Sequence, residues 1–200
     1  MGDMPKRYIS MDVETSGPTP VTSFMCSFGA CVVGDTKKQF YTELRPINEG
    51  ITKENLAVSS KGLKYLDGVR DQSKYNPKSD SFDPEAFLKL AHKKGTDPVK
   101  AMIEFRDWVH IISEKHKPVL VARPSAFDAM WIHSYFDLLR INNPFGFGGE
   151  DMNSFYRGRL GNLEANISDI LSGELSHNAL DDAITQAKAF ESILSGLKRD

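Results

Sequence analysis

The stretch Ile9-Ser10-Met11-Asp12-Val13-Glu14-Thr15 decides the fold, because apolar and polar residues alternate along it. Alternation of this kind predicts a β-strand with one apolar and one polar face. Residues two apart on a strand project from the same face, so Asp12 and Glu14 are expected side by side. Such a pair can bind divalent cations, which prefer carboxylate oxygen. On its own, however, an Asp-x-Glu pair is more typical of a solvated strand face.

Two more strands and several helices are expected after this strand. Apolar residues over 24–33 predict a mostly buried strand, and alternation over 38–44 predicts another. Short turns between the three strands favour an antiparallel meander. Asp-Pro pairs at 83–84 and 97–98 mark two helix starts. The expected later elements are a short helix over 52–58, a helix over 83–94, a helix from 98 to about 115, a strand over 119–122, a helix through 130–139, an edge strand near 151–152 and a closing helix over 179–197. This order predicts an α/β layer architecture.

The region at about 59–83 is the least regular part of the chain. It is rich in Ser, Lys, Asp, Gly and Tyr and carries a turn signal at Asn76-Pro77. We expect residues 1–200 to form a single domain, with this region as a polar insertion or long loop. Loops of this length tend to be functional lids or disordered segments, and the sequence leaves both open.

Net charge, cysteine spacing and hydropathy argue against a strongly basic nucleic-acid-coating protein, a disulfide-bonded protein and a membrane protein. The formal net charge is −2 with a pI near 6.2, so any binding of nucleic acid must use a local basic patch or metal ions. Cys26 and Cys31 lie too far apart on one strand to pair, and free thiols are expected. No apolar stretch approaches the ~20 residues of a membrane span, and the N-terminus lacks a signal-peptide core. These features predict a cytoplasmic protein without membrane contact.

Two further carboxylates, Asp128 and Asp182, and one histidine, His177, lie far from Asp12 and Glu14 in sequence. Taken singly, Asp128 suits a helix N-terminus, and His177 suits an ordinary surface or core position. Carboxylates that a fold gathers repel one another unless a cation offsets their charge. In this order, and on these expected elements, the five residues predict metal-dependent chemistry on phosphate.

These residues resemble the motifs of a known family, the DEDD superfamily of 3′–5′ exonucleases, histidine subclass. The resembling segments are Asp12-x-Glu14-Thr15, Phe127-Asp128 and His177-x-Ala179-Leu180-x-Asp182-Ala183. The tyrosine subclass carries tyrosine where this chain has Asn178. One departure is Arg123-Pro124-Ser125-Ala126 before Phe127, where the family commonly has His-Asn-x-x. The resemblance implies a ribonuclease H-like fold, with a central mixed β-sheet flanked by helices.

The resemblance also implies a mechanism and a set of partners. Asp12, Glu14, Asp128 and Asp182 would hold two divalent ions, Mg²⁺ or Mn²⁺, about 4 Å apart. His177 would act as the general base, and nucleoside 5′-monophosphates would leave from the 3′ end of single-stranded RNA or DNA. Whether the chain forms a homodimer is left open. The neighbouring Asp181 is expected to be solvated, because the family spacing selects Asp182 for the metals.

Substrate contacts are expected near the first and second motifs. Backbone groups of Thr15 and Gly17 can approach the terminal nucleotide, since glycine permits a close turn. Aromatic and sulfur-containing side chains can stack on bases, although core packing is the commoner use of such residues. The residues with this potential are Phe24, Met25, Phe127 and Trp131. Arg157 and Arg159 can contact phosphate or form a solvated pair.

Two other functions remain open at the level of sequence. The chain can be a binding module for nucleic acid or protein that keeps the fold without turnover. It can also be a metal-dependent phosphohydrolase for small nucleotides. The preference between RNA and DNA is likewise undecided, because a 2′-hydroxyl contact depends on geometry.

Overall fold

The computed structural model describes residues 4–171, 173 and 175–196. One five-stranded mixed sheet forms its centre, in the order β3-β2-β1-β4-β5. The strands are β1 (Lys6–Thr15), β2 (Met25–Val32), β3 (Asp35–Glu43), β4 (Lys117–Ala122) and β5 (Glu150–Asp151). The first three pair antiparallel, as the meander prediction requires, and β4 and β5 add in parallel on the other side of β1.

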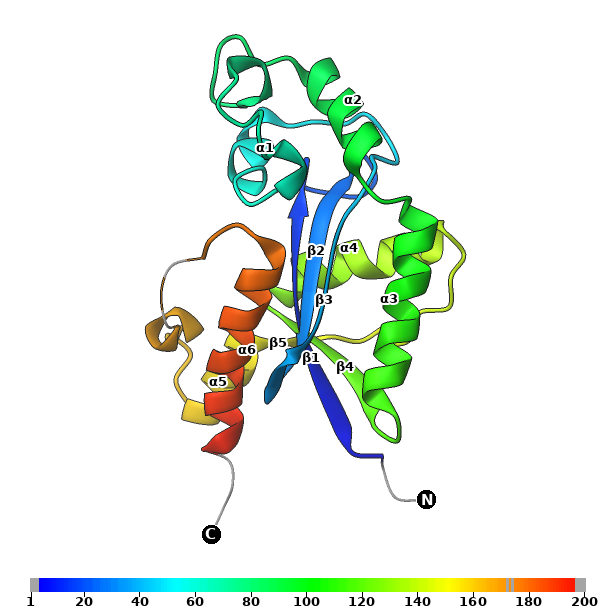
Figure 1. The fold of residues 1–200 in the computed structure, drawn as a ribbon. Coiled ribbons are helices and arrows are strands. Elements are labelled where there is room, and N and C mark those ends of the chain that lie inside the picture. Colours follow the sequence, from blue (N-terminus) through cyan, green and yellow to red (C-terminus); the bar gives the residue numbers. More distant parts are fainter. Residues whose placement is uncertain (1–3, 172, 174, 197–200) are drawn as a thin grey trace.

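Helices cover both faces of the sheet (Figure 1). One face is covered by α3 (Pro98–Ser113) and α4 (Ser125–Leu138), and the other by α5 (Met152–Leu160) and α6 (Ala179–Ser195). The α1 helix (Lys53–Ser59) and α2 (Pro84–Lys94) lie beyond the end of the sheet to which β1 points. The predicted ribonuclease H-like architecture is confirmed.

The two faces of β1 have separate roles in packing. Its apolar residues Ile9, Met11 and Val13 join the core formed with α3 and α4. Its other face lies under α6, where the Ser10 hydroxyl donates to the carbonyl of Ala183 over 2.8 Å. The alternation in sequence therefore decides which helix meets which side chain, and it places Asp12 on the α6 face.

The polar region 59–83 is more ordered than its composition suggests. It contains two 3₁₀ helices, η1 (Lys64–Leu66) and η2 (Ser73–Tyr75). Leu63, Tyr65 and Phe82 are buried there, in an apolar cluster shared with α1 and α2. Burial of these apolar groups fixes the segment beside the sheet end.

Several sequence predictions need correction at their boundaries. The helix at 98 ends at Ser113, and β4 begins already at Lys117. The structure adds α5, which the sequence analysis missed, directly after the edge strand β5. Asp151 caps it, because its carboxylate accepts the amide hydrogen of Ser154 over 2.8 Å. The end of the predicted closing helix, residue 197, lies outside the described residues. No helix in the described part of the chain is long and apolar enough to cross a membrane.

Candidate active site

The C-terminal half of β1 extends beyond its pairing with β4. The pairing of β1 with β4 ends at Ser10, and β1 continues for five residues. A strand edge of this kind leaves backbone N–H groups without a partner. The Asp128 side chain, from the first turn of α4, accepts the amide hydrogen of Val13 over 3.1 Å. This hydrogen bond holds Asp128, of the second motif, beside the strand that carries Asp12 and Glu14.

The α6 helix reaches the site because β2 has no side chain at one position. Gly29 pairs with Asp12 across the two strands. A Cβ atom on Gly29 would lie 2.3 Å from the backbone nitrogen of Leu180. Glycine is therefore required there for close approach, and the N-terminal turn of α6 packs on the strand position that pairs with Asp12.

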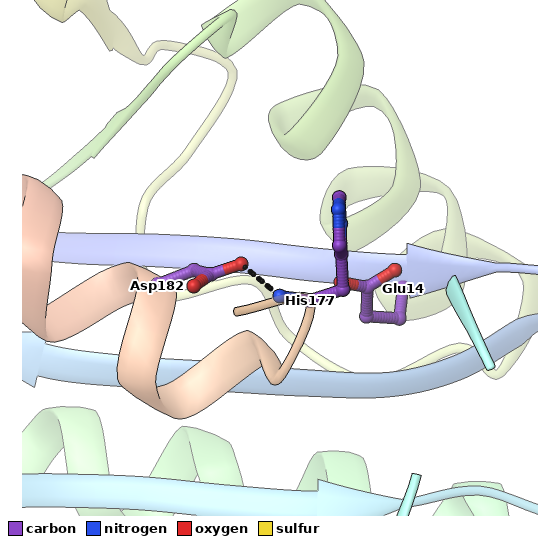
Figure 2. Close-up of side chains that lie close together, drawn as sticks. All are labelled: Glu14, His177 and Asp182. Atoms are coloured by element: carbon purple, nitrogen blue, oxygen red, sulfur yellow. Dashed lines mark hydrogen bonds between the residues drawn. The ribbon is translucent and has the colours of Figure 1, made fainter. Parts of the chain in front are cut away.

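The Asp182 carboxylate organises the turn before α6. One oxygen accepts the backbone N–H and the hydroxyl of Ser176, over 2.7 and 3.0 Å. The other accepts the backbone N–H of His177 over 2.9 Å, shown as a dashed line in Figure 2. His177 has a left-handed backbone, with φ +60°, a conformation that is uncommon outside glycine. The hydrogen bonds to Asp182 hold that conformation in place.

Glu14, His177 and Asp182 form a group that can hold a metal ion. One ligand atom from each lies within 4.8 Å of the others. Glu14 comes from β1, and the other two come from the start of α6 and the turn before it. Asp12 lies beside this group, because its carboxylate accepts the side-chain amide hydrogen of Gln186 over 3.0 Å. Gln186 follows Asp182 by one helical turn and is completely buried.

Burial and mutual repulsion dominate the electrostatics of these carboxylates. Burial, and then the charges of Asp128, Glu14 and Asp182, raise the pKa of Asp12 well above its usual range. Burial, with Asp182 and Asp128, raises the pKa of Glu14 to about 9. Burial also raises the pKa of Asp128 to about 7. Because each group disfavours the charge of the next, a cation is the natural complement of this cluster.

A lysine from the polar region faces the same cluster. Lys61 is an exposed cation whose charge opposes the rise in the pKa of Glu14. The pKa of His177 is lowered, first by partial burial and then by Lys61, while Asp182 acts in the opposite direction. A lowered pKa keeps the imidazole neutral near physiological pH, which is the state that accepts a proton.

The segment carrying Lys61 is packed tightly against the histidine turn. A Cβ atom on Gly62 would lie 2.1 Å from the carbonyl oxygen of His177. The side-chain amide of Asn178 donates to the Gly62 carbonyl over 3.0 Å, while its own carbonyl oxygen caps α6. The position of the histidine turn thus depends on a segment more than a hundred residues earlier in the chain.

A pocket of about 340 Å³ adjoins Glu14. It lies between the end of β1, the helix α1 and the start of α4. Its lining residues are Val13, Glu14, Thr15, Glu54, Asn55, Val58, Ser59 and Phe127. Two of the expected substrate contacts, Thr15 and Phe127, therefore border a cavity next to the carboxylates.

Four other residues considered as substrate contacts are buried. Phe24 and Met25 are completely buried, in the α1–α2 cluster and the main core respectively. We therefore withdraw both as substrate contacts. Gly17 is buried in its turn, where a Cβ atom would lie 2.1 Å from the Ser23 hydroxyl, and its carbonyl accepts from Thr15. Trp131, the remaining aromatic, is completely buried in the core.

The two arginines are engaged within their own chain. Arg157 donates to the carbonyl of Ala165 and Arg159 to that of Gly196. Asp181, by contrast, is exposed at the start of α6. The residues that sequence analysis missed are Gly29, Lys61, Gly62 and Gln186. Only Gln186 carried a usable signal, because it lies four residues after Asp182 on the same helix face.

The chain matches a known family and a known relative in sequence. The family model of the 3′–5′ exoribonuclease Rv2179c-like domain matches residues 7–194. The chain belongs to this family. A relative of 32% identity over a 195-residue alignment is the 3′–5′ DNA exonuclease Cap18 of Escherichia coli; the match covers 93% of this chain and 90% of that protein. The chain is therefore a 3′–5′ exonuclease, as the resemblance in sequence implied.

Solved structures show the same fold. The nuclease domain of 3′hExo, a DEDDh family member bound to rAMP, has a TM-score of 0.65 at 12% identity and covers 96% of this chain and 92% of that chain. Exonuclease I of E. coli, in its zinc-bound complex with single-stranded DNA, has a TM-score of 0.61 at 12% identity. The match to exonuclease I covers 98% of this chain but only 42% of that chain.

Proposed function

We propose that this exonuclease releases nucleoside 5′-monophosphates from the 3′ end of single-stranded nucleic acid, with two divalent metal ions and His177 as general base. The observation that carries the proposal is the convergence of Asp12, Glu14, Asp128 and Asp182 at the open end of β1. No other arrangement of the described carboxylates combines burial, mutual repulsion and an adjoining pocket.

The donor set fits hard divalent cations. Carboxylate oxygens are the ligands that Mg²⁺ and Mn²⁺ prefer, and the four acids offer them from β1, α4 and α6. Burial and mutual repulsion raise the pKa values of Asp12, Glu14 and Asp128, so the charged forms of these three acids call for a cation beside them. When bound, the ions lower the pKa of the attacking water and stabilise the charge on the leaving 3′ oxygen.

His177 supplies the proton acceptor in this proposal. Its ring is only partly buried and stands beside Glu14 (Figure 2). Its lowered pKa makes the neutral form dominant at neutral pH, and a neutral imidazole can accept the proton of the attacking water. The left-handed backbone and the backbone hydrogen bond to Asp182 fix the position of the residue from which the ring extends.

The pocket beside Glu14 suits the terminal nucleoside. Phe127, from α4, and Val58, from α1, both line it, and each offers apolar surface to a base. Asn55 and Ser59 offer polar groups, although the Ser59 hydroxyl already donates to the Thr15 carbonyl over 2.7 Å. The family name refers to RNA and the E. coli relative to DNA, so the test must include both sugars.

The test uses single-stranded RNA and DNA of the same sequence, labelled at the 5′ end, with Mg²⁺, Mn²⁺ or EDTA. We expect a ladder that shortens from the 3′ end with metal and disappears in EDTA. Binding of a 3′ end without any ladder would favour the binding-module alternative. Equal rates on mononucleotide esters and oligomers would instead favour a small-nucleotide phosphohydrolase.

A further inference from the structure

A second hollow begins at Lys61 and runs over the polar region. Its volume is about 420 Å³, within the range of ligand sites. Its lining residues belong to α1 and to the segment after it, which lie beyond the end of β1 in Figure 1. The lining residues are Ala57, Ser60, Lys61, Leu66, Arg70, Asp71, Tyr75, Asn76, Pro77 and Lys78. We call this hollow the basic groove.

Charge in the basic groove is opposite to that of the carboxylate cluster. Lys61, Arg70 and Lys78 line it, against a single acid, Asp71. Within the described chain, neither Lys61 nor Lys78 forms an ion pair. Both are exposed, so their charges are available to an anion. A net positive groove next to a phosphate-cleaving site is complementary to a nucleic-acid backbone.

The backbone around Lys61 is held on both sides. Arg70 donates to the carbonyls of Ser60 and Leu63, over 2.7 and 2.5 Å. Gly62 accepts from Asn178 in the histidine turn. Lys61 is thus placed by fixed neighbours at the point where the groove meets the site. It belongs to both, because its charge also acts on Glu14 and His177.

Recognition in the groove is of phosphate rather than of bases. The aromatic residue that lines it, Tyr75, has the Lys74 ammonium 5.0 Å from its ring centroid. That ammonium competes with a base for the ring. Phosphate contacts fix the position of a strand but carry no sequence information, so the groove is suited to any single strand.

We propose that the basic groove binds the single strand that precedes the 3′ end, with Lys61 at the phosphate next to the cleaved one and Lys78 at a phosphate further along. The proposal rests on the proposed exonuclease function for its direction. Its substance, a phosphate-binding track formed by residues 57–78, can be tested without turnover.

The test measures binding of a 5′-fluorescein single strand of about 12 nucleotides, a length that spans such tracks, by anisotropy in EDTA. Each phosphate contact contributes about 0.7 to the slope of log K against log salt for single strands. We expect Lys78→Ala to lower that slope by about 0.7 and to weaken binding equally for different sequences. The matched control is Lys115→Ala, an exposed lysine just before β4 at the other end of the sheet.

The same variants are then assayed for KM with metal, on a dinucleotide and on the long strand. We expect Lys78→Ala to raise KM more for the long strand than for the dinucleotide. Three outcomes would overturn the proposal that the groove binds the strand: an unchanged salt slope in Lys78→Ala, no binding of the strand, or equal effects of Lys78→Ala and Lys115→Ala. A missing ladder with an altered salt slope would instead overturn the catalytic proposal and leave the groove standing.

Discussion

The carboxylate cluster and the basic groove lie side by side but are constructed in opposite ways. The cluster is negative, with Asp12 half-buried and the other three carboxylates buried, and it is carried by strand β1 and the starts of α4 and α6. The groove is exposed, positive and carried by short turns that apolar residues and Arg70 hold in place. Buried charges interact strongly and are little screened by salt, whereas exposed charges are screened within about 8–10 Å. In the proposed division, catalysis belongs to the cluster and strand binding to the exposed groove.

The largest expected effect separates the cluster from its solvated neighbour. Asp182→Ala removes a proposed metal ligand and releases the backbone of Ser176 and His177, so turnover should fall at least about 1,000-fold, equivalent to about 4 kcal/mol. Asp181→Ala changes an exposed side chain and should leave turnover within about 2-fold. Initial rates of nucleotide release measure both. Similar losses in the two variants would mean that the third motif is misaligned.

A backbone change should disturb the cluster without touching a carboxylate. Gly29→Ala places a methyl group 2.3 Å from the Leu180 nitrogen, so α6 must move away from Asp12. We expect about 1–3 kcal/mol of destabilisation and a clear loss of activity in urea and rate measurements. Gly158→Ala is the control, because a Cβ atom there meets open space. That variant should be neutral or stabilise by up to about 1 kcal/mol; equal behaviour of the two would refute the close-approach argument.

A smaller effect is expected from the residue behind Asp12. Gln186→Met keeps the side-chain volume near its original value but removes the hydrogen bond to the carboxylate. Loss of such a partner typically lowers metal affinity by about 10–100-fold, so activity should recover at high Mn²⁺ concentration. Titration calorimetry with Mn²⁺ gives the affinity directly. Gln39→Met, on an exposed position of β3, serves as the control, and an unchanged affinity in Gln186→Met would exclude the positioning role.

The last prediction concerns how the stability of the metal-free protein depends on pH. The pKa of Glu14 rises from 4.5 to about 9 and that of Asp128 from 3.8 to about 7 on folding. A raised pKa in the folded state gives stability that is complete below the unfolded value and is lost as pH rises through the folded value. The Tm in EDTA should therefore fall between about pH 5 and pH 9, and Mg²⁺ should reduce the fall. Asp128→Asn should flatten the EDTA curve, and an EDTA curve that rises with pH would contradict the repulsion.

The grouping of the four carboxylates could be predicted from the sequence because they lie on a strand and on the first turns of two helices. Alternation in β1 places Asp12 and Glu14 on the α6 face, and the Asp-Pro starts of α2 and α3 are found where expected. The groove could not be predicted, since it depends on how Leu63, Tyr65 and Phe82 pack and on which carbonyls Arg70 binds. Gly29 and Gly62 show the same limit, because their roles arise only when distant segments meet. Phe24 and Met25 were wrong as substrate contacts because their apolar side chains complete the two cores.

The most direct test of the account is a crossed measurement on Asp12→Asn and Lys78→Ala. Mn²⁺ binding by calorimetry and strand binding by anisotropy in EDTA are recorded for each variant and for the unmodified protein. We predict that Asp12→Asn weakens Mn²⁺ binding but keeps the salt slope of strand binding. Lys78→Ala should keep Mn²⁺ binding and lose about 0.7 of the slope. If either variant changes both properties equally, the division between a metal-binding cluster and a strand-binding groove is contradicted.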